Sequence, residues 1–201
     1  MINTNEKPRL IIIAGPNGSG KTSVTHRILK HEWVEGCEYI NPDNIARDMF
    51  GDWNSIEAMM KAARYATEKR EKILSDGHNL IFETVLSAPD KIHYIQKAKD
   101  KGYFTRLFFI CTDNPRINAA RIAHRVMTGG HDVPITKIIN RYYKAITNCE
   151  ILVPLVDRLY VYDNSIENEF PKLLFRASEG VLTKEYNPIH DWSKTIYEAT
   201  L

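Results

Sequence analysis

Four positions near the amino terminus have the spacing of a phosphate-binding loop. Gly15, Gly20, Lys21 and Thr22 match G-x-x-x-x-G-K-[ST] between an apolar run and a helix-like segment. Glycines without a Cβ let successive backbone N–H groups turn inward around phosphate oxygens. The lysine can reach the β- and γ-phosphates, and the threonine hydroxyl is a ligand for Mg²⁺. A glycine turn that binds nothing is the alternative, but the flanking segments favour a site for ATP and Mg²⁺. Thr22 is the expected metal ligand. The residues expected to bind ATP are Gly15, Pro16, Asn17, Gly18, Ser19, Gly20, Lys21, Thr22 and Ser23.

Acidic residues follow other predicted strands. Asp43 lies on the corner after the strand 38–40 and is the candidate base that orients and deprotonates an accepting hydroxyl; alternatively, it caps a helix starting near Asn44. Glu83 ends the strand 79–82 and is a candidate for binding substrate hydroxyls or Mg²⁺ through water, or an ordinary terminal charge. Asp113 follows the strand 103–111. Parallel strands place their carboxyl ends on one rim, so we expect these acids to converge with the glycine loop.

A basic segment follows the strand 103–111. Arg121 and Arg125 are four residues apart and share one face of a predicted helix, and a Gly-Gly loop separates this helix from the next. A solvated helix face is the usual explanation for such spacing. A mobile lid over about residues 116–145, which brings positive charge onto the triphosphate, is the interpretation we favour. Its charged residues are Arg116, Arg121, His124, Arg125, His131, Lys137, Arg141 and Lys144.

Strands and helices alternate along the chain. Apolar and β-branched runs predict parallel strands, and the segments between them have helical spacing and stop signals. This pattern predicts an α/β P-loop NTPase fold of three layers, with a parallel sheet and helices on both faces. The expected form is kinase-like, with the helical lid, a carboxyl-terminal hairpin over 173–184 and a closing helix over 188–200. No repeat or linker interrupts the chain, so we expect a single P-loop kinase domain over 1–201.

Composition restricts the class of protein. The chain has 201 residues and a formal charge of +2, with 43% hydrophobic and 26% charged residues, which are ordinary globular values. The charge gives no reason to expect nucleic acid as a partner. The three cysteines show no C-x-x-C spacing, which argues against a disulfide framework or a zinc site, and two of them lie in apolar runs, where buried reduced thiols are expected. A polar amino terminus and no long apolar run predict a cytoplasmic protein without a membrane partner.

The phosphate loop alone does not say what happens to the γ-phosphate. The chain has no N-K-x-D motif to read guanine, and the strand ends at Glu83 and Asp163 are weak candidates for a mechanical ATPase. Kinases need less, because phosphoryl transfer depends on positioning, Mg²⁺ and positive charge. The leading interpretation is an ATP-dependent kinase that acts on a small hydroxylated molecule. A nucleoside or polynucleotide kinase and a non-catalytic, ATP-dependent interaction module are the alternatives.

Four motifs together resemble the zeta toxin family. They are the glycine loop, Asn41-Pro42-Asp43-Asn44-Ile45-Ala46, Phe82-Glu83-Thr84, and the segment from Arg125 through Gly129-Gly130-His131-Asp132-Val133-Pro134 to Arg141-Tyr142. The resemblance spans about residues 9–163 and is nearest to a short branch of the family. It implies a toxin–antitoxin function, with an antitoxin protein as partner and a nucleotide sugar such as UDP-N-acetylglucosamine as phosphoryl acceptor.

The same resemblance implies particular residue roles. Lys21 is the phosphate lysine, Thr22 the Mg²⁺ ligand and Asp43 the catalytic base, and Glu83 and Thr84 contact the substrate. Arg125 stabilises the transferred phosphate. Where larger toxins have a second lid arginine, this chain has His131, and Arg141 on the following helix is placed to supply that charge.

Overall fold

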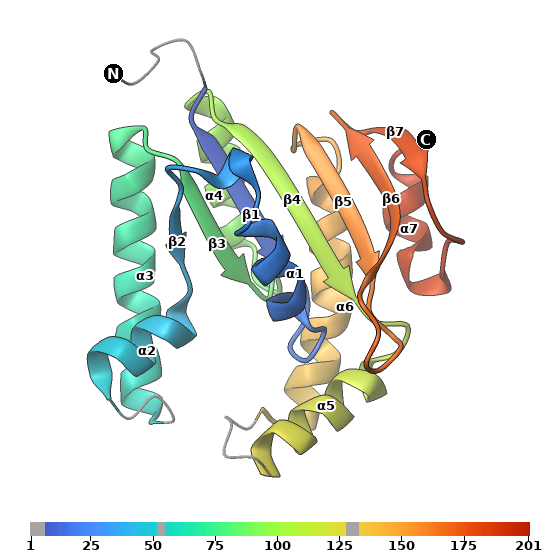
Figure 1. Ribbon diagram of the computed structural model, residues 1–201, viewed down its shortest axis with the longest axis horizontal. Coiled ribbons are helices and arrows are strands. Elements are labelled where there is room, and N and C mark those ends of the chain that lie inside the picture. Colours follow the sequence, from blue (N-terminus) through green and yellow to red (C-terminus); the bar gives the residue numbers. More distant parts are fainter. Residues whose placement is uncertain (1–6, 52–54, 128–132) are drawn as a thin grey trace.

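The apolar run before the glycine loop forms an interior strand, β1 (Arg9–Ala14), of a seven-stranded sheet (Figure 1). A computed structural model describes residues 7–51, 55–127 and 133–201. The strand order is β2-β3-β1-β4-β5-β6-β7; the first five strands pair in parallel, and β6 and β7 are antiparallel. The remaining strands are β2 (Glu38–Ile40), β3 (Leu80–Thr84), β4 (Phe104–Cys111), β5 (Arg158–Asp163), β6 (Lys172–Ser178) and β7 (Val181–Glu185).

Helices cover both faces of this sheet, as predicted. One face packs against four helices and the other against α1 and a short 3₁₀ turn at Glu32–Val34 (Figure 1). In the described ranges, no helix is long and apolar enough to cross a membrane. The helices are α1 (Lys21–Ile28), α2 (Pro42–Phe50), α3 (Ile56–Asp76), α4 (Asp90–Asp100), α5 (Pro115–Met127), α6 (Ile135–Leu152) and α7 (Lys194–Glu198).

The alternation of side chains along β1 builds two separate cores. Leu10 and Ile12 belong to a large cluster with α3, α4, α6 and α7, whereas Ile11 and Ile13 belong to a smaller one under α1. A strand buried on both faces needs a continuous apolar run, which is why this segment shows no polar alternation. Each such side chain contributes about 1.5–3 kcal/mol by leaving water. Cys111 joins the large cluster as a buried free thiol, as the sequence predicts.

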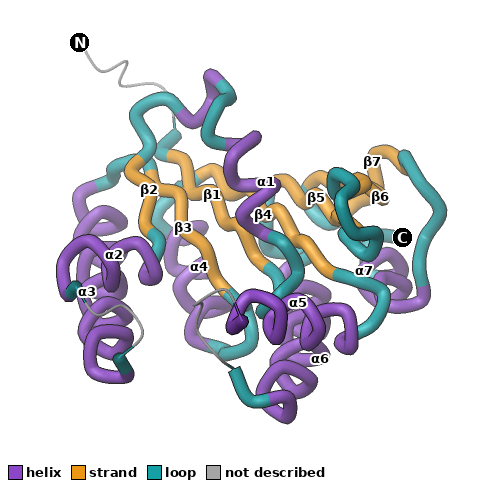
Figure 2. Tube along the Cα trace, turned by 60° about the horizontal axis from the view of Figure 1, so that its bottom comes forward, coloured by secondary structure: helices purple, strands orange, loops and turns teal. Residues whose placement is uncertain are grey.

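The connections of the sheet place the ends of β1, β3 and β4 at one opening. After β1 the chain forms β2 and β3 on one side of β1, and it then crosses to form β4 on the other side. The carboxyl end of β1 therefore lies where the strand order reverses, which is the usual ligand position in such sheets. Figure 2 shows α2 and α3 on one side of these strand ends and α5 and α6 on the other.

The carboxyl-terminal segment differs in part from its prediction. The hairpin is confirmed as β6 and β7, but the closing helix predicted over 188–200 is only α7, preceded by a 3₁₀ turn at Asp191–Ser193. His190 is extended, so the helix begins later than predicted. Trp192 instead anchors the segment, because its Nε1 donates to Asp163 Oδ2 at 3.0 Å. Asp163 also accepts from Ser165, so this carboxylate supports the fold.

Asp157, in the turn before β5, fastens the start of β4 to α4. Its carboxylate accepts from Lys99 Nζ at 2.6 Å, from Thr105 N at 2.7 Å and from Thr105 Oγ1 at 2.8 Å. Burial opposes the charge, but these hydrogen bonds more than offset it and hold the pKa of Asp157 below its ordinary value. Replacing Asp157 by alanine leaves three donors without their acceptor, so we expect the free energy of unfolding to fall by about 2–4 kcal/mol.

Urea unfolding of Asp157→Ala at several pH values measures this loss. Because the folded pKa is depressed, the stabilisation is complete above the unfolded pKa of about 3.9 and is lost as the pH falls through the folded pKa. The difference from wild type should therefore shrink in acid. Asp100→Ala, at the exposed end of α4, is the matched control and should change stability by less than about 0.5 kcal/mol. An equal loss in both variants would contradict the role given to Asp157.

Candidate active site

The glycine loop turns sharply from β1 into α1 because three of its residues have no side chain. Gly18 and Gly20 have φ angles of 76° and 83°, in the left-handed region. A Cβ at Gly15 would lie 2.0 Å from Ile110 O, one at Gly18 2.6 Å from Asn118 O, and one at Gly20 2.1 Å from Asn164 Nδ2. The loop is therefore pressed against β4, α5 and the segment after β5, as a phosphate cradle requires.

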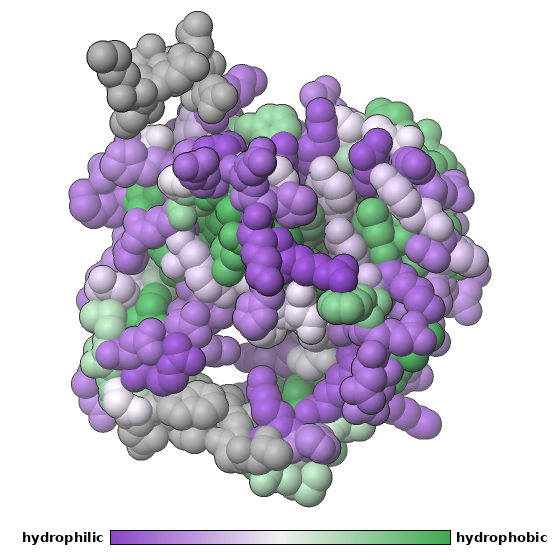
Figure 3. Space-filling view, in the orientation of Figure 1, coloured by the Kyte–Doolittle hydropathy of each residue, from purple (hydrophilic) through white to green (hydrophobic). Residues whose placement is uncertain are grey.

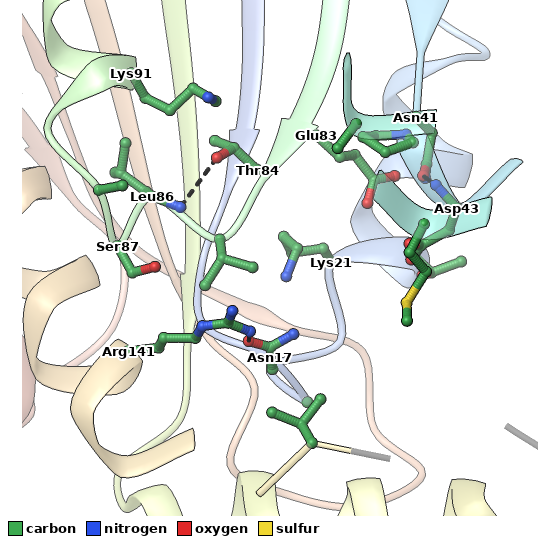
Figure 4. Close-up of a pocket in the computed structure, with 18 of the residues that line it drawn as sticks. Asn17, Lys21, Asn41, Asp43, Glu83, Thr84, Leu86, Ser87, Lys91 and Arg141 are labelled. Atoms are coloured by element: carbon green, nitrogen blue, oxygen red, sulfur yellow. Dashed lines mark hydrogen bonds between the residues drawn. The ribbon is translucent and has the colours of Figure 1, made fainter. Parts of the chain in front are cut away.

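Asparagine side chains hold the loop in this shape. Asn118 Nδ2 on α5 donates to Asn17 O at 2.6 Å, and Asn164 Nδ2 after β5 donates to Ser19 O at 2.8 Å. Arg141 Nη1 on α6 donates to Asn17 Oδ1 at 3.1 Å (Figure 4). Sequence reasoning missed Asn118 and Asn164, because nothing local to either residue indicates contact with a loop more than a hundred positions away.

Lys21 is the first residue of α1 and points into the pocket (Figure 4). Its Nζ donates to the loop carbonyls of Gly15 at 2.8 Å and Pro16 at 3.1 Å. Burial lowers the pKa of Lys21, and the nearby carboxylates of Glu83 and Asp43 act in the opposite direction. The ammonium group therefore lies where phosphate oxygens and two acids can both reach it.

The pocket has a volume of about 730 Å³ and opens between α2 and α3 on one side and α5 and α6 on the other. In Figure 3 this face is hollowed below the strand ends, and hydrophilic side chains border the hollow. Thr22, the second residue of α1, lines it. No cluster of three or more acidic, histidine or cysteine ligands exists among the described residues. The donor set fits Mg²⁺ bound by Thr22 and phosphate oxygens, since this ion is rarely held by protein ligands alone.

Asp43 lies on the first turn of α2, and its side chain is exposed at the pocket wall (Figure 4). The helix cap is Asn41, whose Oδ1 accepts from Asp43 N at 2.9 Å. The alternative in which Asp43 caps the helix is therefore wrong. Its carboxylate is left to face Lys21 and the opening of the pocket.

Glu83 at the end of β3 is held by a chain of hydrogen bonds. Its Oε1 accepts from Thr25 Oγ1 at 2.8 Å and from Tyr39 OH at 2.5 Å, and Asn41 Nδ2 donates to Tyr39 OH at 3.0 Å. Burial and the hydrogen bond to Glu83 raise the pKa of Tyr39, which keeps the phenol neutral and able to donate. Glu83 is thus fixed in orientation through one oxygen, and the residue lines the pocket. Tyr39 and Thr25 were missed from the sequence.

Thr84 and the residues after it form the far rim. Thr84 Oγ1 accepts from Leu86 N at 3.1 Å, closing a tight turn (Figure 4). Leu86 is buried and has a φ of 59°, a conformation that costs a leucine of the order of 1 kcal/mol or more. Asn148 Nδ2 donates to Leu86 O at 2.8 Å and helps hold the turn. Strain of this kind, kept beside a pocket, is typical of functional sites.

Three of the predicted lid arginines, Arg121, Arg125 and Arg141, line the pocket. Arg121 Nη1 is buried and has no hydrogen-bond partner within the described part of the chain. A buried guanidinium nitrogen of this kind is suited to an anionic ligand. The structure does not bring the other predicted basic residues to the pocket wall, and His131 lies outside the described residues. Those that do not line it are Arg116, His124, Lys137 and Lys144.

The predicted lid divides into two parts. Ile122 on α5, Val133 and Ile138 form a small apolar cluster of their own. Tyr142 and Ala145, further along α6, belong to the main core, and Tyr142 OH donates to Thr112 O at 2.6 Å. Any lid movement would therefore involve α5 and the start of α6, not the whole of 116–145.

Other predicted residues play no direct part in the pocket wall. Gly15 and Pro16 offer their carbonyls to Lys21, Ser19 is buried within the loop, and Ser23 is exposed on α1. Asp113 does not join the other acids at the opening, as had been expected. It lies at the exposed end of β4, where its Oδ1 is 3.9 Å from His190 Nδ1.

A phosphate loop at the switch point of a parallel sheet, with an acid and several arginines around one pocket, defines an ATP-dependent kinase of the P-loop class. A family model described as zeta toxin matches residues 2–170. The chain belongs to the zeta toxin family, which confirms the resemblance seen in its motifs.

Three individual proteins illustrate what the chain is similar to, the two solved structures in fold alone. An uncharacterized protein of Haemophilus influenzae is 29% identical over 134 residues, which cover 67% of this chain and 92% of that protein. A structure of the PezAT toxin–antitoxin system of Streptococcus pneumoniae matches with a TM-score of 0.61 at 22% identity, covering 79% of this chain and 69% of that one. The AvrRxo1-ORF1:AvrRxo1-ORF2 complex with ATP has a TM-score of 0.66 at 17% identity, covering 98% of this chain and 64% of that one.

Proposed function

We propose that the protein transfers the γ-phosphoryl group of Mg-ATP to a hydroxyl of a small molecule, a nucleotide sugar such as UDP-N-acetylglucosamine. The observation that carries the proposal is the position of Lys21 and Asp43, which face one pocket with room for an acceptor beside the loop. Membership of the zeta toxin family supports the same reaction. We treat residues 1–201 as one domain, place the protein in the cytoplasm and expect an antitoxin partner.

Different residues of the pocket have different roles in the transfer. Lys21 and the loop N–H groups bind the triphosphate, while Arg121, Arg125 and Arg141 stabilise charge on the moving phosphoryl group. Thr22 would hold Mg²⁺, which would supply positive charge to the phosphates when bound. The acceptor oxygen forms the new P–O bond, the bond to the bridging oxygen of ADP breaks, and the hydroxyl proton passes to the Asp43 carboxylate. Glu83 and Thr84 orient the acceptor.

Labelled ATP tests the proposal. Purified protein is incubated with Mg²⁺, γ-labelled ATP and one acceptor at a time. The acceptors are UDP-sugars, nucleosides, 5′-hydroxyl oligonucleotides and a metabolite extract. Products are identified by mass spectrometry. Label in a UDP-sugar supports the proposal, and label in nucleosides or oligonucleotides supports the alternative kinases. ATP that keeps its γ-phosphate with every acceptor, while a partner is captured tightly, would instead indicate an interaction module.

A further inference from the structure

The face of the sheet that carries α1 also carries a row of basic side chains. On this face α1 and the 3₁₀ turn pack on β1 and β4, and no described helix lies in front of β5, β6 and β7 (Figure 1). The strand register places Arg106 on β4 beside Arg158 on β5, and Tyr160 on β5 beside Arg176 on β6. Arg176 in turn pairs with Lys184 on β7. Residues paired in register point to the same side of a sheet, so Arg106, Arg158, Arg176 and Lys184 form one basic surface.

The arginines of the basic surface are not balanced by acids. Within the part of the chain that the structure describes, Arg106, Arg158 and Arg176 form no ion pair. Arg106 Nε is buried and lacks a hydrogen-bond partner among the same residues. Burial lowers the pKa of Arg106, and the nearby charges of Arg158 and Arg9 lower it further. Because a guanidinium keeps its charge in proteins, cations crowded together in this way are suited to an anionic ligand.

Aromatic rings lie directly beside these cations. His31, Trp33, Phe108 and Tyr160 form a row of stacked rings, whose successive centres are 5.1, 5.8 and 4.7 Å apart. The guanidinium carbon of Arg106 lies 4.7 Å from the ring centre of Trp33. His31 is exposed, and Trp33 and Tyr160 are half-buried, so a ligand can reach the ring row from solvent. Rings interleaved with arginines are typical of surfaces that stack nucleic-acid bases while they neutralise phosphates.

A second cavity, of about 200 Å³, adjoins the ring row. Trp33, Phe108 and Tyr162 line it together with residues of α1. Arg27 also lines it, and its guanidinium carbon lies 3.7 Å from the ring centre of the exposed Phe170. Small-molecule sites usually have volumes of about 300–1,000 Å³, so this cavity suits a single ring system and not a whole nucleotide. One base of a longer strand could therefore enter it while the neighbouring phosphates stay outside.

We propose that this face binds a single-stranded nucleic acid, whose phosphates contact Arg106, Arg158 and Arg176 and whose bases stack on the ring row. An acidic peptide would use the cations but not the rings, and the bases of a duplex are already stacked on one another. The formal charge of the whole chain, +2, does not reveal such a surface, because it depends on where the cations gather. The inference is independent of the proposed kinase reaction, since none of these residues lines the active-site pocket.

Fluorescence anisotropy with labelled oligonucleotides tests the proposal. The full chain is saturated with Mg²⁺ and the non-hydrolysable analogue AMP-PNP, so that the phosphate loop is filled. It is then titrated with oligouridine and with oligothymidine of about 12 nucleotides. At least one strand should bind with a Kd below about 10 μM in about 50 mM salt and more weakly as the salt rises. A duplex of the same length, polyglutamate and inorganic polyphosphate, each matched in charge, should compete about tenfold less well or worse.

Variants separate the phosphate contacts from the base contacts. Arg176→Gln, at an exposed position, should weaken the strand by about three- to tenfold and reduce the slope of log Kd against log salt by about 0.7. Arg106→Gln should weaken it by about tenfold, with Arg106→Lys between this variant and wild type. Tyr160→Leu should cost about fivefold or more without changing the salt slope, because it removes a ring and no charge.

An arginine elsewhere on the molecule provides the matched control. Arg64 is exposed on α3 and pairs with Glu68, so Arg64→Gln should keep the affinity for the strand within about twofold of wild type. In all four variants of the basic surface and ring row, AMP-PNP affinity should change by less than about twofold, which also shows that they are folded.

Several results would overturn the inference. Wild type could bind neither strand, or Arg106→Gln and Arg176→Gln could both leave the affinity unchanged. Equal competition by polyphosphate or polyglutamate would show that the face recognises charge alone, and equal competition by the duplex would exclude contact with the bases. A protein that phosphorylates its acceptor but binds no strand would keep the proposed function and remove this inference. A protein that binds the strand but transfers no phosphate would do the reverse.

Discussion

Asp43→Ala should strongly slow phosphoryl transfer to the acceptor while Mg-ATP remains bound. A positioned general base contributes about 10²- to 10⁴-fold, so kcat should fall by that factor. The helix that carries Asp43 should survive, because Asn41 provides its cap and the Asp43 backbone N–H remains. Initial rates with labelled ATP measure the transfer, and calorimetric titration with AMP-PNP measures the binding.

The same helix offers a matched control. Asp48 is an exposed acid on α2, paired with Arg47, and does not line the pocket. Asp48→Ala should leave both transfer and binding within about twofold of wild type. If Asp43→Ala transfers phosphate at the wild-type rate, Asp43 is not the base, and Glu83 becomes the residue to replace next.

Lys21→Ala should remove nucleotide binding together with activity. Lys21 Nζ is the ammonium group that the loop presents in the pocket, and charge-assisted hydrogen bonds to phosphate contribute about 1.5–3 kcal/mol each. We therefore expect ATP affinity to weaken about 100-fold or more and transfer to fall below detection. Fluorescence or calorimetric titration with ATP analogues provides the measurement.

Lys30→Ala is the control for this variant, because Lys30 is exposed just after α1 and lies away from the pocket. Wild-type affinity is expected for it. The two active-site variants should thus separate, with Asp43→Ala binding ATP normally and Lys21→Ala failing to bind. Normal ATP affinity in Lys21→Ala would contradict the role of the glycine loop.

The sequence predicted most of the sheet because its strand signals are local. Each parallel strand is a short apolar run closed by glycine, proline or an acid, and the glycine spacing before Lys21 identifies the loop by itself. Asp43 and Glu83 were found because parallel strands end on one rim. Asp113 shows the limit of that argument, since the rim extends beyond the pocket.

Residues whose importance depends on tertiary contacts could not be predicted. Arg70 is one of several basic residues on a long helix, and only packing against Phe82 reveals that it is buried while Arg64 is exposed. Tyr39 and Thr25 meet Glu83 from separate elements. The late start of the last helix likewise accompanies a long-range contact, that of Trp192 with Asp163.

The contact of Trp192 with Asp163 links the carboxyl-terminal segment to the phosphate loop. Asn164, the residue after Asp163, holds the carbonyl of Ser19 in the phosphate loop. The family match ends at residue 170, yet the tail beyond it braces the strand end that supports this asparagine. Proteolytic removal of the segment from Trp192 onward would therefore loosen the support of the phosphate loop and weaken ATP binding, while all seven strands stay in the chain.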